Sequence, residues 1–236
     1  MQYADIIGDR IDRFRNGYIF TPSEFYDVVD NPVIVSRILG AMVSQGKIRR
    51  ILKGKYDKPM KSAFGTLPPS IDWQVRAFLF DGRTQIGYMT GTRVFAELGL
   101  TTQITSVIEV GSNTYRRAIV RNGYTIKFVL QRNRICAENV PLLQLLDAIR
   151  FVKTIPATMV DDALAVIRQK VVSMPQPLRE RMAQLAMNYA CYVRAVLGVI
   201  LDEMGDDTTS LYDSLNKASN YNVGSSTFKN KKWRVV

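Results

Sequence analysis

The chain has 236 residues, of which 47% are hydrophobic, with a formal net charge of +11 and an isoelectric point near 9.7. This length and hydrophobic content allow one or two globular domains, and the basic excess predicts a polyanionic partner or an anionic surface. The sequence has no histidine, which excludes Ser-His and Cys-His nucleophilic pairs and the commonest neutral metal ligand. It also has no Gly-rich phosphate loop, so we expect no enzyme activity, no cofactor and no metal site.

The two cysteines, Cys136 and Cys191, lie far apart in apolar surroundings. We expect two buried free thiols in a reducing compartment. Charged residues at positions 5, 9 and 10 interrupt any apolar leader, and the longest apolar run, near residues 195–201, is far shorter than a membrane span. We therefore expect a cytoplasmic protein without a membrane partner.

A helix is predicted over residues 3–14, with the apolar residues at helical spacing facing inward: Tyr3, Ile7, Ile11 and Phe14. The next helix has an explicit start, because Thr21 is a good N-cap, Pro22 suits the first helical position, and Glu24 completes a capping box. Phe20 and Phe25 are placed to form a hydrophobic staple.

A third helix follows after a short turn, with Asn31 as its N-cap, Pro32 at its first position and Gly46 at its end. Its inward face is predicted to hold Val35, Ile38, Leu39 and Met42. The opposite face has small side chains around one long cation, Arg37, which is able to read a guanine edge or hold a phosphate. The alternative is a solvated helix with an ordinary surface arginine, and both interpretations stay open here.

A basic hairpin is predicted over residues 47–61, with Lys53-Gly54 as its turn and apolar anchors at Ile48, Ile51 and Tyr56. Asp57 is its one acid among seven cations: Lys47, Arg49, Arg50, Lys53, Lys55, Lys58 and Lys61. A positive hairpin directly after a capped helix pair is typical of a wing that lies along a phosphate backbone. The sequence thus predicts a winged helix-turn-helix over residues 1–60 that binds nucleic acid.

Residues 61–70 are predicted to be a linker, because Gly65 and Pro68-Pro69 block regular structure. A second domain over residues 71–236 then begins with a helix at 71–80, capped by Ser70 and stopped by Asp81-Gly82. A short strand at 87–89 and a helix at 90–98, closed by Gly99, come next.

Strands are predicted at residues 106–110, 115–120 and 124–130, with turns at Ser112-Asn113 and Asn122-Gly123, which together indicate a short antiparallel sheet. Cations alternate with apolar residues along it and would form one basic face. This face either binds a partner or merely keeps the protein in solution. Its members are Arg116, Arg117, Arg121, Lys127, Arg132 and Arg134.

Three helices are predicted to close the fold, over residues 141–152, 157–172 and 176–204. The chain then becomes polar and ends in a basic tail that contains Trp233, which we expect to dock on its own domain rather than on nucleic acid. The fold class expected overall is α+β, with a winged helix-turn-helix followed by a mixed α/β domain.

Several segments resemble one known family. GYIFTPSEF, VSRIL and GKIRRILKGKYDKP are similar to the N-terminal domain of AbiE-type antitoxins, and GYMTGTRVFAELGLTTQI is similar to a later segment of the same family. LYDSLNKASNYNVG resembles the family's C-terminal signature, although Lys217 stands where proline is commoner. The resemblance covers most of the chain in the right order.

This resemblance implies a bacterial toxin–antitoxin system of the abortive-infection type, a form of phage defence. Such a protein represses its own operon by binding promoter repeats in double-stranded DNA, and it counteracts a nucleotidyltransferase-like toxin through its C-terminal part. The candidate DNA-binding residues are Thr21, Ser23, Ser36, Arg37, Ser44, Arg49, Arg50, Lys53, Lys55 and Lys58. Weaker candidates for the antitoxin role are Thr90, Thr92, Arg93 and the basic strand face, while residues 99–103 are expected to be structural.

Two alternatives remain. One is a non-enzymatic protein-interaction module, or a solitary regulator without a toxin, whose charge only aids solubility. The other is RNA binding by the basic sheet, which lacks the aromatic pair expected on the middle strands of such platforms.

Overall fold

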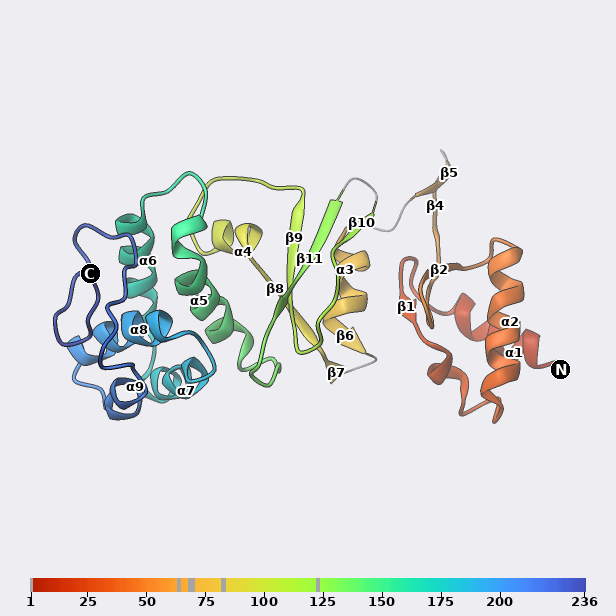
Figure 1. The fold of residues 1–236 in the computed structure, drawn as a ribbon. Helices are drawn as coiled ribbons and strands as arrows, with labels where there is room; N and C mark the ends of the chain where they lie inside the picture. The colour runs from red at the N-terminus through yellow and green to blue at the C-terminus, as the bar shows by residue number, and fades with distance from the viewer. Residues whose placement is uncertain (1, 63–64, 68–70, 82–83, 122–123) are drawn as a thin grey trace. The chain divides into compact units, whose positions relative to one another are not determined.

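In the computed structural model the chain forms two compact units, Met1–Thr84 and Gln85–Val236 (Figure 1). The structure describes residues 2–62, 65–67, 71–81, 84–121 and 124–236, with the side chains of 60–62, 65–67, 71–74 and 121 left aside. The chain is α+β, as the sequence predicts. The units divide between Thr84 and Gln85, later than the predicted linker at 61–70. Each unit is described separately below.

The first part of unit 1, residues 2–59, is built on the helices α1 and α2 and a small sheet. Helix α1 (Tyr3–Asp12) precedes β1 (Ile19–Phe20), η1 (Pro22–Phe25) and α2 (Pro32–Ser44), and the hairpin β2 (Arg49–Leu52) and β3 (Lys55–Asp57) follows. The strands form an antiparallel sheet in the order β1-β3-β2. Its core takes residues from α1, β1, η1, α2 and β3 and from the segments between them, among them Ile7, Phe20, Leu39 and Ile48. The rings of Phe20 and Phe25 pack edge to face, with 5.7 Å between their centroids, which confirms the predicted hydrophobic staple.

Two details of this unit differ from the prediction. Tyr3 is 52% exposed rather than inward. The second predicted helix is only the 3-10 turn η1, because Asp27 is held by Arg10 of α1 at 2.7 Å and the Asn31-Pro32 start of α2 follows so soon. The residue before a proline also avoids helical backbone angles, which limits any extension of η1.

Residues predicted as linker contain a short antiparallel hairpin of β4 (Met60–Ser62) and β5 (Gly65–Leu67). Gly65 begins β5 instead of blocking structure, since it pairs with Ser62 at the turn end of the ladder. Helix α3 (Ile71–Leu79) and the strand pair β6 (Phe80–Asp81) and β7 (Thr84–Gln85) come next. Pro68, Pro69, Ser70 and Gly82, to which the sequence assigned breaks and a cap, lie outside the described residues.

The second unit contains a four-stranded sheet in the order β10-β11-β9-β8. Its strands are β8 (Gly87–Thr90), β9 (Val107–Ser112), β10 (Ile119–Arg121) and β11 (Tyr124–Leu130), and α4 (Thr92–Glu97) follows β8. The sheet is mixed, which corrects the antiparallel prediction, because β9 and β11 run parallel. The short β10, whose Val120 is 76% exposed, suits only the edge, so the more apolar β11, with Ile126 fully buried, lies between β10 and β9.

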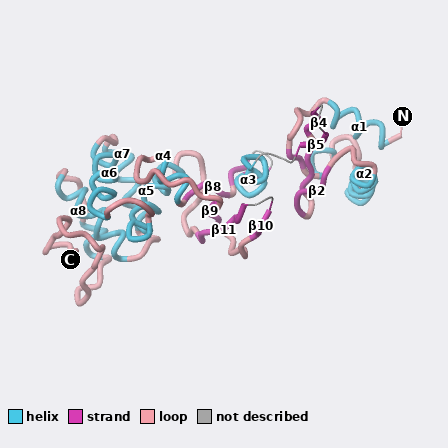
Figure 2. The backbone as a smooth tube through the Cα atoms, turned by 90° about the horizontal axis from the view of Figure 1, so that it is seen from above, coloured by secondary structure: helices cyan, strands magenta, loops and turns pink. Residues whose placement is uncertain are grey.

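Helices gather on one side of this sheet, as Figure 2 shows. They are α5 (Val140–Phe151), η2 (Val152–Thr154), α6 (Val160–Val172), α7 (Gln176–Ala186), α8 (Cys191–Glu203) and α9 (Thr209–Asp213). The single helix predicted at 176–204 is therefore two helices, α7 and α8. At the break, Asn188 Nδ2 donates to Asn133 Oδ1 at 2.7 Å, and Tyr189 points its hydroxyl into a buried polar network. Among the described residues, no helix is long and apolar enough to cross a membrane.

The buried polar network joins the sheet to the helices around Asp147 of α5. Its carboxylate accepts hydrogen bonds from Tyr88 at 2.6 Å, Thr90 at 2.9 Å and Tyr189 at 3.0 Å. Burial raises the pKa of Asp147, and the three hydroxyl donors oppose that shift. Gln131 Nε2 donates to both tyrosine oxygens, at 2.9 and 2.8 Å. The network fixes the position of β8 and β11 relative to α5.

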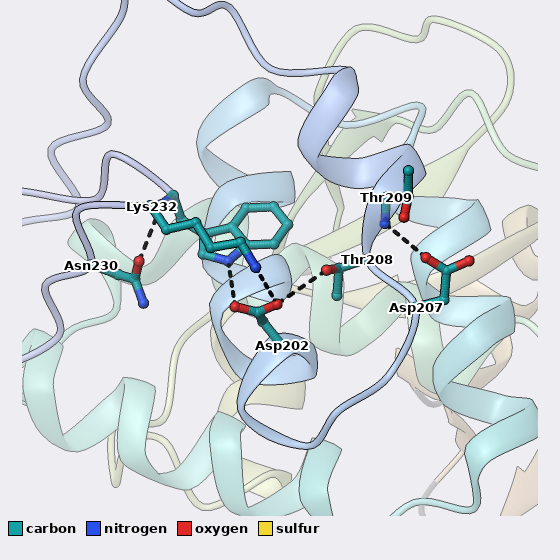
Figure 3. A network of polar contacts seen from close by, with 7 residues as sticks. Asp202, Asp207, Thr208, Thr209, Asn230 and Lys232 are labelled. Carbon is teal, nitrogen blue, oxygen red and sulfur yellow. Dashed lines mark hydrogen bonds and ion pairs between the residues drawn. The ribbon is translucent and has the colours of Figure 1, made fainter.

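The basic C-terminal tail docks on its own unit, where Lys232 lies beside Asp202 of α8 (Figure 3), and the sequence predicts this docking for Trp233. Trp233 is fully buried against Gly198 of α8, and its Nε1 donates to Asp202 at 3.4 Å. Lys232 Nζ donates to the same carboxylate at 2.5 Å. The free thiols Cys136 and Cys191 are half-buried rather than buried as expected.

Candidate nucleic-acid interface

Helix α2 is fixed at both ends by local interactions. Asn31 Oδ1 accepts from the backbone N–H groups of Val33 and Ile34 at 3.0 and 3.3 Å, and Gly46, with φ +69°, ends the helix in the left-handed conformation. The inward face buries Val35, Leu39 and Met42, with Ile38 partly buried beside them. These ends and this core contact determine which face of α2 remains outward.

The outward face of α2 consists of exposed residues: Val33, Ser36, Arg37, Gly40, Ala41 and Ser44. A side chain at Gly40 would meet no atom within 4 Å, so the helix backbone is open to close approach there. Ser44 Oγ already donates to the Gly40 carbonyl at 3.2 Å. Arg37 has no hydrogen bond or ion pair within the part of the chain that the structure describes.

The β2–β3 hairpin turns at Lys53-Gly54, as the sequence predicts, with Gly54 at φ +71°. Ile48, Ile51 and Tyr56 are buried and anchor the hairpin on unit 1. Arg50 and Lys53 are exposed, as is Lys47 just before β2. Within the described residues, none of these three cations has a protein partner, so their charges are available to a ligand.

Three further cations of this segment were predicted to contact DNA, but their side chains have partners inside unit 1. Arg49 pairs with Asp57, from Nη2 to Oδ2 at 2.6 Å. Lys55 Nζ donates to the carbonyls of Ala77 and Phe80, at 2.5 and 3.1 Å. Lys58 Nζ donates to the carbonyls of Asp12 and Phe14, at 2.7 and 3.2 Å, and so satisfies groups at the end of α1. These side chains stabilise the unit.

Thr21 and Ser23 belong to the start of η1. Thr21 N donates to Glu24 Oε1 at 3.1 Å, which is the predicted capping interaction, and the Thr21 and Ser23 hydroxyls lie 2.7 Å apart. Glu24 also accepts from Tyr18 Oη at 3.1 Å. The two hydroxyls therefore have a structural role, although Ser23 remains exposed.

The weaker candidates lie in the second unit and separate into buried and exposed residues. Thr90 is fully buried and donates to Asp147, so it is a core residue and not a surface contact. Thr92 N donates to Glu109 at 3.3 Å. Arg116 lies over the Phe128 ring at 5.9 Å. The exposed members are Arg93, Arg116, Arg117, Lys127, Arg132 and Arg134, while the Arg121 side chain lies outside the description.

Comparisons with known proteins identify a similar fold but no family. The chain is similar to the crystal structure of the RV2827C protein from Mycobacterium tuberculosis, at 12% sequence identity and a TM-score of 0.50. The match covers 99% of this chain and 90% of that protein. At this identity the similarity concerns the fold alone. No protein-family model and no curated protein matches the chain.

The structure also brings Arg132, a member of the basic strand face, together with residues that the sequence did not assign to any site. Arg150 of α5 lies near Arg132 and Asn188, around a cavity beside the break between α7 and α8. Helical spacing placed Arg150 on an ordinary amphipathic helix, and the break was predicted as continuous helix. No local pattern in the sequence therefore pointed to this group.

Proposed function

We propose that unit 1 is a winged helix-turn-helix that binds double-stranded DNA, with α2 as the recognition helix and the β2–β3 hairpin as the wing. The observation that carries this proposal is the difference among the cations of this segment. Arg37, Arg50 and Lys53 are exposed and have no protein partner among the described residues, whereas Arg49, Lys55 and Lys58 are held within the unit. Cations kept free beside a small-sided helix face suit phosphates and base edges.

The free cations have separable roles under this proposal. Arg37 at the centre of the outward face of α2 contacts a guanine edge or the phosphate beside it, which gives sequence preference. Arg50 and Lys53 on the hairpin contact phosphates, which gives affinity without sequence preference. Loss of a phosphate contact weakens binding to all sequences and reduces the salt slope by about one per cation.

A mobility-shift assay on the DNA upstream of the gene tests this, run at two salt concentrations with the full chain. We expect Arg50→Ala/Lys53→Ala to weaken binding to every sequence and to flatten the salt dependence. We expect Arg37→Ala to reduce the preference for the upstream DNA over unrelated DNA by about tenfold. The matched control is Arg13→Ala/Arg15→Ala, which removes two exposed charges at the end of α1. Equal loss in the control, or no shift for the wild type, contradicts the proposal.

The biological role that fits is repression of the protein's own operon, combined with neutralisation of a nucleotidyltransferase-like toxin by unit 2. Support for this role comes from the resemblance to AbiE-type antitoxins. This role is tested by co-expressing the protein with a toxin gene from the same operon. The toxin alone should stop growth, and the protein should restore it through unit 2. If the hairpin variants keep full partner binding and the wild type binds no DNA, the protein is an interaction module instead.

A further inference from the structure

The second unit contains a cavity of about 320 Å³ at the end of β11, beside the α7–α8 break. It is lined by Leu130, Gln131, Arg132, Arg150, Asn188, Tyr189 and Ala190. Its size lies at the lower end of the range for small-molecule sites. Its residues come from the end of β11 and the two residues after it, from α5 and from the segment before α8, so tertiary packing assembles it.

The floor of this cavity is rigid because its polar groups are already used. Gln131 Nε2 donates to the Tyr88 and Tyr189 hydroxyls at 2.9 and 2.8 Å, and Gln131 Oε1 accepts from Asn133 N at 2.8 Å. Tyr189 Oη donates to Asp147 at 3.0 Å. A ligand therefore gains little from new hydrogen bonds to the floor, and recognition depends on the walls.

The walls carry two guanidinium groups, and that of Arg150 also interacts electrostatically with the buried carboxylate of Asp147. Arg132 is exposed and Arg150 half-buried, and within the described residues neither side chain has a hydrogen bond or ion pair. The Arg150 guanidinium carbon lies over the Phe151 ring, 5.1 Å from its centroid, and this contact restricts the position of the guanidinium group. Among the described residues that line the cavity none is acidic, and Asp147, the nearest carboxylate to Tyr189, is buried behind the floor and occupied by three hydroxyl donors.

The start of helix α8 adds to the positive potential. Ala190, its N-cap residue, lines the cavity, and α8 continues for 13 residues. The amide groups of a helix N-terminus favour an anion. Tyr192 Oη donates to the Arg150 carbonyl at 2.5 Å and thereby holds the first turn of α8 next to the end of α5.

We propose that this cavity binds the phosphate group of a small phosphorylated molecule, with Arg132 and Arg150 as its cationic contacts. Two guanidinium forks give bidentate contacts that match the oxygens of a phosphate better than lysine would. The Asn188 Nδ2 group already donates to Asn133 Oδ1, so its side-chain oxygen Oδ1 is the atom that would accept a hydrogen bond from the rest of the ligand. This site belongs to unit 2, whereas the DNA surface is proposed for unit 1.

Isothermal titration of the full chain with inorganic pyrophosphate, at about 0.15 M ionic strength so that distant surface charges are screened, tests the proposal. We expect saturable binding, weakened about tenfold by Arg132→Ala and also by Arg150→Lys, which keeps the charge but loses the fork. The control Lys217→Ala/Lys231→Ala removes two exposed charges of unit 2 away from the cavity and should bind as the wild type does.

Three results overturn the proposal. One is no saturable heat up to about 10 mM pyrophosphate, beyond the range of even weak specific sites. Another is equal weakening in the lysine control. The third is a parallel titration in which the arginine variants lose affinity for a single-stranded oligonucleotide but not for pyrophosphate, because the ligand is then a nucleic acid. Circular dichroism of each variant identifies any loss of fold, and Arg132, being exposed, is the substitution least able to cause one.

Discussion

In the hairpin of unit 1, the Arg49 guanidinium forms hydrogen bonds to both carboxylate oxygens of Asp57, at 3.1 Å from Nε to Oδ1 and 2.6 Å from Nη2 to Oδ2. The two residues face each other across β2 and β3. The Asp57 side chain is fully buried, and that of Arg49 is 29% exposed. The one acidic residue of the basic hairpin, Asp57, is therefore paired with Arg49. The positive charge of the exposed cations of the hairpin is not reduced by this carboxylate.

Arg49→Ala should lower the free energy of unfolding of the protein by about 3 kcal/mol, because it leaves the buried Asp57 charge without a partner. Arg50→Ala, one residue further on and exposed, should change it by less than about 0.5 kcal/mol. Urea denaturation followed by circular dichroism measures both. Similar values for the two variants would show that the ion pair does not stabilise the unit.

Gly40→Ala separates helix stability from close approach to DNA. A methyl group at this position meets no atom within 4 Å, so the variant should stabilise α2 by about 0.5–1 kcal/mol. The same methyl group stands on the face proposed for the groove and should weaken DNA binding by about fivefold. Thermal unfolding and mobility shifts measure the two effects.

Gly8→Ala is the matched control for this experiment. Gly8 lies inside α1, and an added methyl group would be 3.5 Å from the Met42 side chain, an ordinary contact. It should stabilise a helix of the same unit without changing DNA affinity. If Gly40→Ala binds DNA as the wild type does, α2 does not enter the groove.

Sequence reasoning succeeded where the determinants are local. The Asn31-Pro32 start of α2 and the Lys53-Gly54 turn depend on neighbouring residues, and both are present as predicted. It failed where they are distant in sequence. Lys55 is bonded to a carbonyl 22 residues later and Lys58 to one 46 residues earlier, so neither role can be deduced from a charge pattern.

The same limit explains the errors in unit 2. Tyr189 continues the helical spacing of its neighbours, so periodicity predicted an unbroken helix, while its buried bond to Asp147 depends on α5. The parallel pairing of β9 and β11 has no local signal either, because the antiparallel pairing of β10 with β11 is compatible with either sheet order; the predicted turn at Asn122-Gly123 lies outside the described residues. For the candidate site, the sequence predicts that cations gather on α2 and the β2–β3 hairpin. Only the tertiary structure shows which of these cations have partners within the described residues.

Gly198→Ala should displace the docked tail. The added methyl group would overlap the Trp233 ring, which also packs edge to face on Tyr212 at 5.5 Å. Overpacking of this kind costs about 1–3 kcal/mol. In a Trp73→Phe background, Trp233 emission should shift to longer wavelength as the ring becomes exposed.

The double variant Gly198→Ala/Trp233→Phe provides the control. Phenylalanine lacks the part of the indole that meets Gly198, so the destabilisation by alanine should be smaller in this background. An equal loss of stability with tryptophan or phenylalanine at position 233 would place the strain elsewhere in α8.

Asp161 of α6 anchors the segment before the tail, and its effect on stability should depend on pH. Its carboxylate accepts from the hydroxyl of Ser225, from Ser226 Oγ at 2.6 Å and from Thr227 Oγ1 at 2.8 Å. These hydrogen bonds, with that of Ser225 the largest, hold the pKa of Asp161 well below its usual range. A depressed native pKa stabilises the fold above the unfolded value, about 3.9, and this contribution is lost as the pH falls through the native value.

Asp161→Asn should therefore lower the unfolding temperature near neutral pH, and its difference from the wild type should shrink below about pH 4. Thermal unfolding from about pH 7 to about pH 2.5 measures this difference directly, and taking the difference removes the titration of other carboxylates shared by both proteins. Asp162→Asn, at the exposed neighbouring position, is the control and should lower the unfolding temperature near neutral pH by less than Asp161→Asn does. A difference for Asp161→Asn that stays constant over the whole range would mean that its carboxylate charge does not hold the tail, and that the serine and threonine contacts are bonds to a neutral group.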